Sequence, residues 1–169
     1  MSDQIRDAIN GAVEYLTANP AEARYTDSPA TARLEQGLRV TVEGPDGASL
    51  TSDMPTSVGG GNSAPSAGWF LRAAEASCAA TLIAMRAAQL GIALDSVEVT
   101  VDSESDDRGI LGIDEGVVAG PLSTRVVANV SSATASREQI EQIVQWAVSH
   151  CPVTDAVRRA VPMTVELAD

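Results

Sequence analysis

The sequence predicts an α+β protein in which one long central helix packs against antiparallel sheet. The first observation is the segment 66–90, which is almost entirely small and apolar and is typical of a buried helix. The second is a pair of segments, 97–101 and 122–130, in which the β-branched residues typical of strands are frequent. The third is a separate helix signal at 136–149. A chain of 169 residues is long enough to form one such core.

The N-terminal part of the chain combines a helix with short strands. Residues 3–18 carry apolar side chains at helical spacing, and Asn19-Pro20 ends that helix. We therefore divide the chain into an N-terminal helical extension, 1–20, and a main domain, 21–169. Within 22–55, residues 38–42 alternate between apolar and polar, which predicts a strand. The turn signal at 44–47 then predicts that 48–53 returns as its hairpin partner.

The central part of the chain follows a glycine-rich segment at 57–68, which we interpret as a flexible loop. The long helix follows, coated with Ala and Ser and apolar on nearly all sides, and Gly91 is its C-terminal cap. Residues 97–101 alternate as a strand. We expect a turn at 106–109, with pairing continued by 110–113, before the strand at 122–130.

The C-terminal part contains two helix starts and a final strand. Ser136 followed three residues later by Gln139 forms a capping box, which predicts a helix to about Ser149. Cys151-Pro152 then opens a short helix, because Pro suits the first helical position. The alternation at 163–167 predicts a last strand.

The composition excludes several classes of partner. Eleven Lys and Arg against 23 Asp and Glu give a net charge of −12, and such a surface repels phosphate backbones and anionic lipid. Two Trp, two Tyr and one Phe leave no platform for stacking bases. We therefore expect no nucleic-acid partner and no membrane partner. The first residues show no signal peptide and the chain has only two cysteines, so we expect a cytoplasmic location.

The two cysteines are the first candidates for chemistry. Cys151 lies at a helix N-terminus, where unpaired backbone N–H groups and the helix dipole stabilise a thiolate. Cys78 lies inside the long helix and needs a nearby cation to ionise. The alternative is that both thiols simply pack in the core, as free cysteines usually do. One histidine, His150, and two distant cysteines lack the spacing of metal ligands, so we expect no metal and no cofactor.

The order of these features closely resembles the OsmC/Ohr family of osmotically induced and organic-hydroperoxide-resistance proteins. The resemblance covers roughly residues 30–168. It rests on the glycine-rich loop with Pro65, on Ala76-Ser77-Cys78 in the long helix, on Gly91-Ile92-Ala93-Leu94 before the Val97 strand, on Cys151-Pro152-Val153, and on Val161-Pro162-Met163.

The resemblance implies an OsmC-like fold, an intertwined homodimer with active sites at the dimer interface, and a thiol-dependent peroxidase that reduces organic hydroperoxides. Carried onto this sequence, Cys78 is the peroxidatic cysteine, which attacks the O–O bond and becomes a sulfenic acid. Cys151 is the resolving cysteine, which forms a disulfide with Cys78. A dithiol reductant then reopens that disulfide.

This sequence departs from the family pattern at the groups that hold the reactive thiolate. The family has a glutamate just after the loop proline, whereas Pro65 is followed by Ser66 here, and the acid closest to Cys78 in the helix is Glu75. The family's arginine corresponds best to Arg39. The other candidates are Arg33, Arg72 and Arg86.

Two further functions therefore stay open beside the peroxidase. The first is a non-catalytic, dimeric OsmC-like protein that acts in stress or binds a small ligand, favoured by the missing glutamate. The second is a redox sensor in which a disulfide between Cys78 and Cys151 alters a partner surface.

Overall fold

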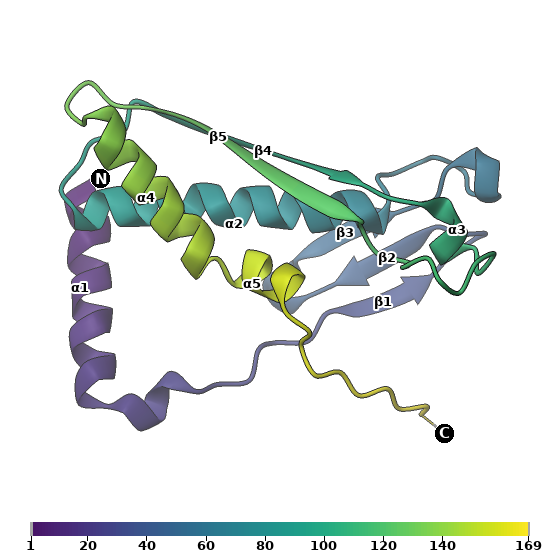
Figure 1. Ribbon diagram of the computed structural model, residues 1–169. Helices are drawn as coiled ribbons and strands as arrows, with labels where there is room; N and C mark the ends of the chain where they lie inside the picture. Colours follow the sequence, from purple (N-terminus) through teal and green to yellow (C-terminus); the bar gives the residue numbers. More distant parts are fainter. Residues whose placement is uncertain (1, 169) are drawn as a thin grey trace. The chain divides into compact units, whose positions relative to one another are not determined.

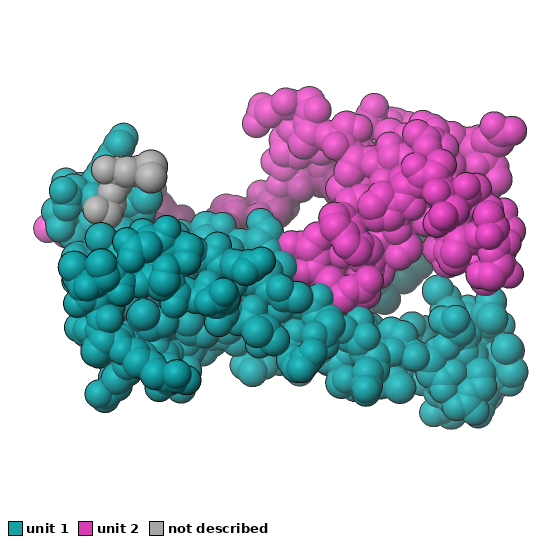
Figure 2. All heavy atoms as spheres, turned by 90° about the horizontal axis from the view of Figure 1, so that it is seen from above, with its two compact units in different colours: residues 1–11, 74–169 teal, residues 12–73 magenta. Residues whose placement is uncertain are grey.

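The computed structural model describes residues 2–168, and the chain divides into two compact units (Figures 1 and 2). One unit comprises Met1–Gly11 with Ala74–Asp169, and the other comprises Ala12–Ala73. Short 3-10 helices lie at Pro20–Ala23, Pro45–Gly47 and Thr56–Val58. The helices and strands are α1 (Ser2–Ala18), β1 (Thr31–Leu34), β2 (Val40–Glu43), β3 (Ser49–Ser52), α2 (Ala67–Gln89), β4 (Ser96–Glu104), α3 (Asp107–Ile110), β5 (Ser123–Ser131), α4 (Arg137–His150) and α5 (Pro152–Arg158).

The unit of residues 12–73 contains a three-stranded antiparallel sheet in the order β1-β2-β3. The predicted hairpin is confirmed, since Val40 of β2 pairs with Ser52 of β3. Its turn contains Asp46 and Gly47 with φ of 56° and 77°, a backbone region that Asp tolerates and Gly favours. The strand β1, which pairs with β2 from Thr31 to Leu34, completes this sheet.

The unit that contains residues 74–168 is built on the two-stranded antiparallel ribbon of β4 and β5, which runs alongside α2 in Figure 1. Along β5 the side chains alternate between exposed and half-buried, so one face of the ribbon turns inward. Helices α2 and α4 cover that face. The fully buried core of this layer consists of Ile83, Ala87, Ile143 and Ala147, and half-buried side chains such as Val97, Val99 and Val130 pack against it. The predicted α+β fold with a long helix against antiparallel sheet is confirmed.

The long helix α2 buries one face within its own chain. Its buried residues Glu75, Ala79, Ile83 and Ala87 recur every four positions and form a single stripe, whereas Ala84 is exposed. The helix is therefore apolar on more sides than its own chain buries. The reason is that β4, β5 and α4 supply neighbours along only one side of the helix. The predicted end is confirmed, because Gly91 follows with φ of 69°.

The two C-terminal helices meet at a single residue. Helix α4 begins with the predicted capping box, in which Ser136 accepts a hydrogen bond from the backbone N–H of Gln139 and the Gln139 side chain accepts one from Ser136. Cys151 ends α4 and is also the N-terminal cap of α5, which begins at Pro152 as predicted. This junction fixes the direction of the Cys151 side chain.

Two local predictions are wrong. Residues 107–110 form the short helix α3 instead of a turn, because Asp106 caps it by accepting a hydrogen bond from the backbone N–H of Arg108, so residues 110–113 do not continue the ribbon. Residues 163–167 form no strand in the described chain, and Met163 and Leu167 are 84% and 98% exposed. An alternating segment becomes a strand only when a neighbouring strand supplies its hydrogen bonds.

Among residues 2–168 no helix is both long and apolar enough to cross a membrane.

Candidate functional site

The candidate site lies where the first turn of α5 meets α2, inside the unit of residues 74–168. On α2, Glu75 and Cys78 are three residues apart and therefore lie on one face of the helix. At the start of α5, Cys151 and Thr154 have the same spacing. The two pairs face each other, because the hydroxyl of Thr154 donates a hydrogen bond to Glu75 and the thiols of Cys78 and Cys151 shift each other's pKa. The structure thus brings both predicted cysteines and the predicted glutamate into one site.

The environment of Cys78 opposes ionisation in the single chain. Burial raises the pKa of the Cys78 thiol, and its hydrogen bond with Cys151 raises that pKa further. A hydrogen bond from the backbone N–H of Val153 acts in the opposite direction without reversing the shift. Cys78 is half-buried, whereas Cys151 is fully buried, so Cys78 is the thiol that a ligand can approach.

The environment of Cys151 favours ionisation. Burial acts to raise the pKa of the Cys151 thiol, but hydrogen bonds from Thr154, Cys78 and the Val153 backbone outweigh burial, and the pKa lies below its ordinary value. The backbone N–H of Thr154 lies 3.4 Å from the sulfur. This direction agrees with the argument from the helix N-terminus.

Glu75 is a buried carboxyl group with one satisfied oxygen. The residue is 1% exposed, and the hydroxyl of Thr154 donates a hydrogen bond to its Oε1 over 3.2 Å. Its Oε2 is buried without a hydrogen-bond partner among the described residues. Leaving a buried carboxyl oxygen unpaired is costly for stability, so this group is a candidate for function.

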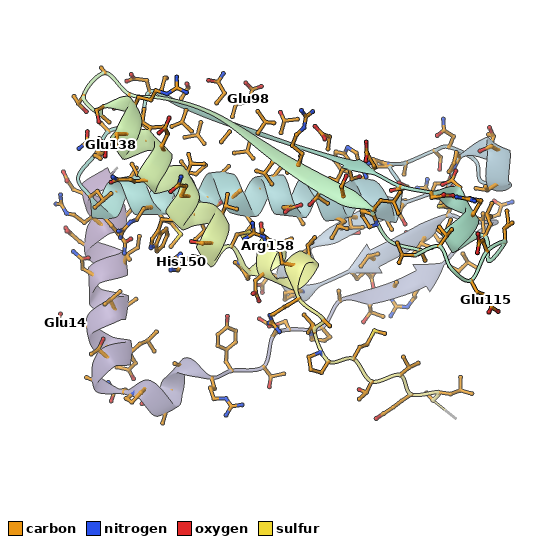
Figure 3. The ribbon with its side chains drawn as sticks, in the orientation of Figure 1. Glu14, Glu98, Glu115, Glu138, His150 and Arg158 are labelled. Carbon is orange, nitrogen blue, oxygen red and sulfur yellow. The ribbon has the colours of Figure 1, made fainter. Side chains whose placement is uncertain are left out.

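A small cavity adjoins the glutamate. Its volume is about 270 Å³, and Glu75 and Thr154 line it together with three valines, Thr124 and Arg158. Figure 3 labels Arg158, which lies on α5. The three valines are Val126 of β5, Val148 of α4 and Val157 of α5. The cavity therefore combines three apolar side chains with a carboxyl group, two hydroxyls and a guanidinium.

The predicted arginine partner of Cys78 remains a prediction. Arg39 belongs to the unit of residues 12–73, where its guanidinium hydrogen-bonds Glu35 and Ser63, each over 2.9 Å. Arg33 pairs with Glu43 in the same unit. The guanidinium of Arg86 lies 4.8 Å from the ring centre of Trp146.

The single histidine is held by structural contacts. His150 stacks on Trp146 with ring centres 4.2 Å apart, and its Nδ1 lies 2.8 Å from the Trp146 carbonyl oxygen. Figure 3 shows it at the C-terminal end of α4. Within the described range, 2–168, His, Cys, Asp and Glu side chains form no group of three or more that could hold a metal ion.

Sequence reasoning missed Thr154, which links the glutamate to the buried thiol. The available signal was its spacing, because Thr154 follows Cys151 by three residues just as Cys78 follows Glu75. That signal has meaning only when the two helices face each other, and the sequence contains no local sign of that contact.

A second buried acid, Asp53, lies in the unit of residues 12–73 and organises the glycine-rich loop. Its carboxylate accepts hydrogen bonds from the backbone N–H groups of Met54, Gly61 and Ser63 and from the Ser63 hydroxyl. The Ser63 bonds are the main reason that the pKa of Asp53 falls to about 2. The loop that the sequence predicts as flexible is thus built around one carboxylate.

Comparison with known proteins identifies a family and a fold. The family profile described as OsmC-like protein matches residues 60–166. No curated protein matches the sequence. An OsmC-like protein of Mycoplasma pneumoniae superposes with a TM-score of 0.67 at 15% identity, over 80% of this chain and 89% of the other.

Two further solved structures carry functional descriptions. An organic hydroperoxide resistance protein OsmC of Legionella pneumophila superposes with a TM-score of 0.59 at 22% identity, over 80% of this chain and 91% of the other. A putative organic hydroperoxide resistance protein of Vibrio cholerae has captopril bound in one of its active sites. It superposes with a TM-score of 0.55 at 24% identity, over 79% of this chain and 87% of the other. At these identities the similarity establishes the fold.

Proposed function

Because the chain belongs to the OsmC-like protein family, we propose that it is a thiol-dependent peroxidase that reduces organic hydroperoxides with Cys78 and Cys151. The observation that carries this proposal is that the two thiols, 73 residues apart in sequence, lie close enough in one site to shift each other's pKa. Similarity to structures described as organic hydroperoxide resistance proteins supports the substrate class.

In the first step, the thiolate of Cys78 attacks the distal oxygen of the hydroperoxide. The S–O bond forms and the O–O bond breaks, the alkoxide takes a proton and leaves as the alcohol, and Cys78 becomes a sulfenic acid. Access supports this assignment, because Cys78 is half-buried whereas Cys151 is 0% exposed.

In the second step, the thiolate of Cys151 attacks the sulfur of the sulfenic acid. The S–S bond forms, the S–O bond breaks, and hydroxide takes a proton and leaves as water. The lowered pKa of Cys151 supports its role as the attacking group at this step. A dithiol then reduces the disulfide in two exchanges and is itself oxidised to a disulfide. A cytoplasmic location suits this cycle, because thiol reductants are kept reduced there.

The first step needs a positive group near Cys78, because burial and the contact with Cys151 raise the pKa of that thiol. We assign this task to Arg39, in a homodimer whose sites are completed at the interface. Light scattering tests the dimer: the expected mass is twice 17.5 kDa, and a folded monomer contradicts it.

The activity test is consumption of cumene hydroperoxide with dithiothreitol as the reductant. We expect Cys78→Ser to lower the rate by more than about 100-fold, since it removes the nucleophile. With no dithiothreitol present, Cys151→Ser should consume one equivalent of peroxide and stop with a sulfenic acid on Cys78, which dimedone labels. Arg39→Ala should lower the rate, whereas Arg137→Ala, at a side chain that is 92% exposed, is the matched control and should not.

A non-catalytic binding protein is the second candidate, favoured by the raised pKa of Cys78 and by Ser66 in the position of the family's glutamate. Equal peroxide consumption by the wild-type protein and by Cys78→Ser would overturn the peroxidase and favour this candidate.

A further inference from the structure

We propose that Glu75 accepts the proton of the Cys151 thiol, with the hydroxyl of Thr154 as the bridge between them. The inference rests on the proposed two-cysteine function and deepens it, because it assigns the fate of the proton when the disulfide forms. Glu75 is then a positioning residue for the buried thiol, in addition to being the helix neighbour of Cys78.

The bridge follows from the contacts of Thr154. Its hydroxyl lies 3.2 Å from Oε1 of Glu75, and its backbone N–H lies 3.4 Å from the sulfur of Cys151, so the hydroxyl stands between the carboxyl group and the thiol. A side-chain hydrogen bond from Thr154 also lowers the pKa of Cys151. A hydroxyl has one proton and two lone pairs, so it can accept from one neighbour while it donates to the other. While Cys151 is a thiol, the S–H donates to Thr154 and Thr154 donates to the carboxylate. After transfer, both hydrogen bonds reverse, and Thr154 donates to the thiolate.

Burial of the thiol favours an internal acceptor for its proton. Cys151 is 0% exposed and Thr154 is 4% exposed, so bulk water does not reach the sulfur within the chain. Glu75 is the acidic side chain in contact with this pair, and its Oε2 has no hydrogen-bond partner among residues 2–168. Glu75 lines the cavity of about 270 Å³, and a proton on its carboxyl group can pass to solvent through that cavity.

The proton balance of the step is then complete. Cys151 loses its proton through Thr154 to the carboxylate of Glu75, and its sulfur attacks the sulfenic acid of Cys78. The S–S bond forms and the S–O bond breaks. The leaving hydroxide takes a proton from solvent to become water, and Glu75 later returns its proton to solvent. The sum is one thiol plus one sulfenic acid giving one disulfide plus one water.

The ionisable and charged groups around Glu75 determine how a pH dependence of disulfide closure can be assigned. On its own helix Cys78 lies three residues after Glu75, and Arg72, a permanent positive charge, lies three residues before it. The junction of α4 and α5 contributes Cys151. Helix α5 contributes Arg158, a permanent positive charge at the cavity. Strand β5 and helix α4 contribute the neutral Thr124, Val126 and Val148. A pH effect that Glu75→Gln removes is therefore assigned to the carboxyl group.

The test isolates disulfide closure from peroxide chemistry. Methyl methanethiosulfonate places a methylthio group on Cys78, and Cys151 then displaces methanethiol to close the disulfide, which acid quench and intact mass detect. We expect Glu75→Gln to slow closure by at least about tenfold near pH 6 and to approach the wild-type rate near pH 9, where the thiol ionises without help. Thr154→Val should behave similarly, and Thr154→Ser should restore closure.

The controls separate the relay from a structural role. Glu138→Gln makes the same chemical change at the exposed N-terminal end of α4 (Figure 3), and its closure profile should match wild type. The relay is overturned if Glu75→Gln closes the disulfide at the wild-type rate at every pH. It is also overturned if the variant is slower by the same factor at every pH. A Thr154→Ser variant as slow as Thr154→Val also overturns it.

The outcome distinguishes the two proposals. A shifted closure profile without consumption of cumene hydroperoxide leaves the relay standing and overturns the peroxidase. If the protein consumes cumene hydroperoxide but Glu75→Gln leaves the pH dependence of closure unchanged, the peroxidase stands and the relay is overturned. No closure in the wild-type protein overturns both.

Discussion

Two buried acids in this chain have nearly the same exposure and opposite surroundings. Asp53 is 3% exposed and Glu75 is 1% exposed. Asp53 accepts four hydrogen bonds, three from the glycine-rich loop and one from the backbone N–H of Met54. Glu75 accepts one, from Thr154, and its second oxygen has no hydrogen-bond partner in the described chain.

The difference separates a structural carboxylate from a reactive one. Hydrogen bonds to both oxygens hold Asp53 in its ionised form, with a pKa of about 2, so it remains charged in ordinary conditions and organises the backbone. An unpaired buried oxygen does not contribute to stability in that way, and a protein retains such a group at a cost. We therefore expect changes at Asp53 to affect unfolding and changes at Glu75 to affect reactivity.

The largest expected effect on stability is that of Asp53→Asn. The amide has only one acceptor oxygen and places an NH₂ group against backbone N–H donors, so part of the network is lost. We expect the melting temperature to fall by roughly 10 °C, measured by calorimetry at neutral pH. A fall in melting temperature of less than about 2 °C would show that Asp53 does not have this structural role.

Asp53 also makes the stability of the protein depend on pH in the acid range. The pKa of Asp53 is lower in the folded state, about 2, than the ordinary value of about 3.9 in an unfolded chain. The stabilisation is thus present above about pH 4 and is lost as the pH falls from about 4 to about 2. Urea unfolding across this window should show a smaller pH dependence in Asp53→Asn than in the wild-type protein.

A somewhat smaller loss is expected from Gly60→Ala, which tests the loop without altering the acid. A Cβ at Gly60 would lie 1.9 Å from the Met54 carbonyl oxygen, so the backbone must move away from its position around Asp53. We expect a fall in melting temperature of roughly 5–8 °C. Gly120→Ala, where a Cβ meets nothing within 4 Å, is the matched control and should change little.

Ser63→Ala should have a smaller effect. The substitution removes the 2.7 Å contact of the hydroxyl with Asp53 and the hydrogen bond from Arg39 to the same hydroxyl, and keeps the backbone N–H contact with Asp53. We expect a fall of roughly 2–4 °C. Ser77→Ala, on the exposed side of α2, serves as the control. Equal melting temperatures for both variants would mean that the side chain of Ser63 contributes nothing measurable.

The smallest effect on stability is expected at the other acid. Glu75→Met replaces a buried, half-satisfied carboxyl group with an apolar side chain of similar length, so the melting temperature should stay within roughly 2 °C of wild type or rise. Disulfide closure in the same variant should be slow. A fall of 5 °C or more would show that Glu75 holds the fold together, contrary to the comparison.

The sequence predicted elements whose signals are local. The capping box at Ser136 and Gln139 and the cap at Gly91 involve groups within a few residues of each other, so these helix ends could be read directly. Residues 163–167 show the limit, because alternation there predicts a strand that only a distant partner could complete.

The sequence also predicted only part of the candidate site. Resemblance to a family pointed to Cys78 and Cys151, and the structure brings both thiols into one site, whereas their roles are still predictions. The roles of Arg39 and of the dimer are still predictions. The bridge from Glu75 to Cys151 was not predicted, since Thr154 has no distinctive motif of its own.

The sequence by itself thus determined the four longer helices, most strands, the family and the two sulfurs. Only the tertiary structure decided that Glu75 meets Thr154 across 79 residues of chain, and that one of its oxygens is buried unpaired. The physical reason is range: caps and periodicity act over a single helical turn or hairpin, whereas hydrogen bonding and burial of a carboxyl group depend on which distant helix packs against it.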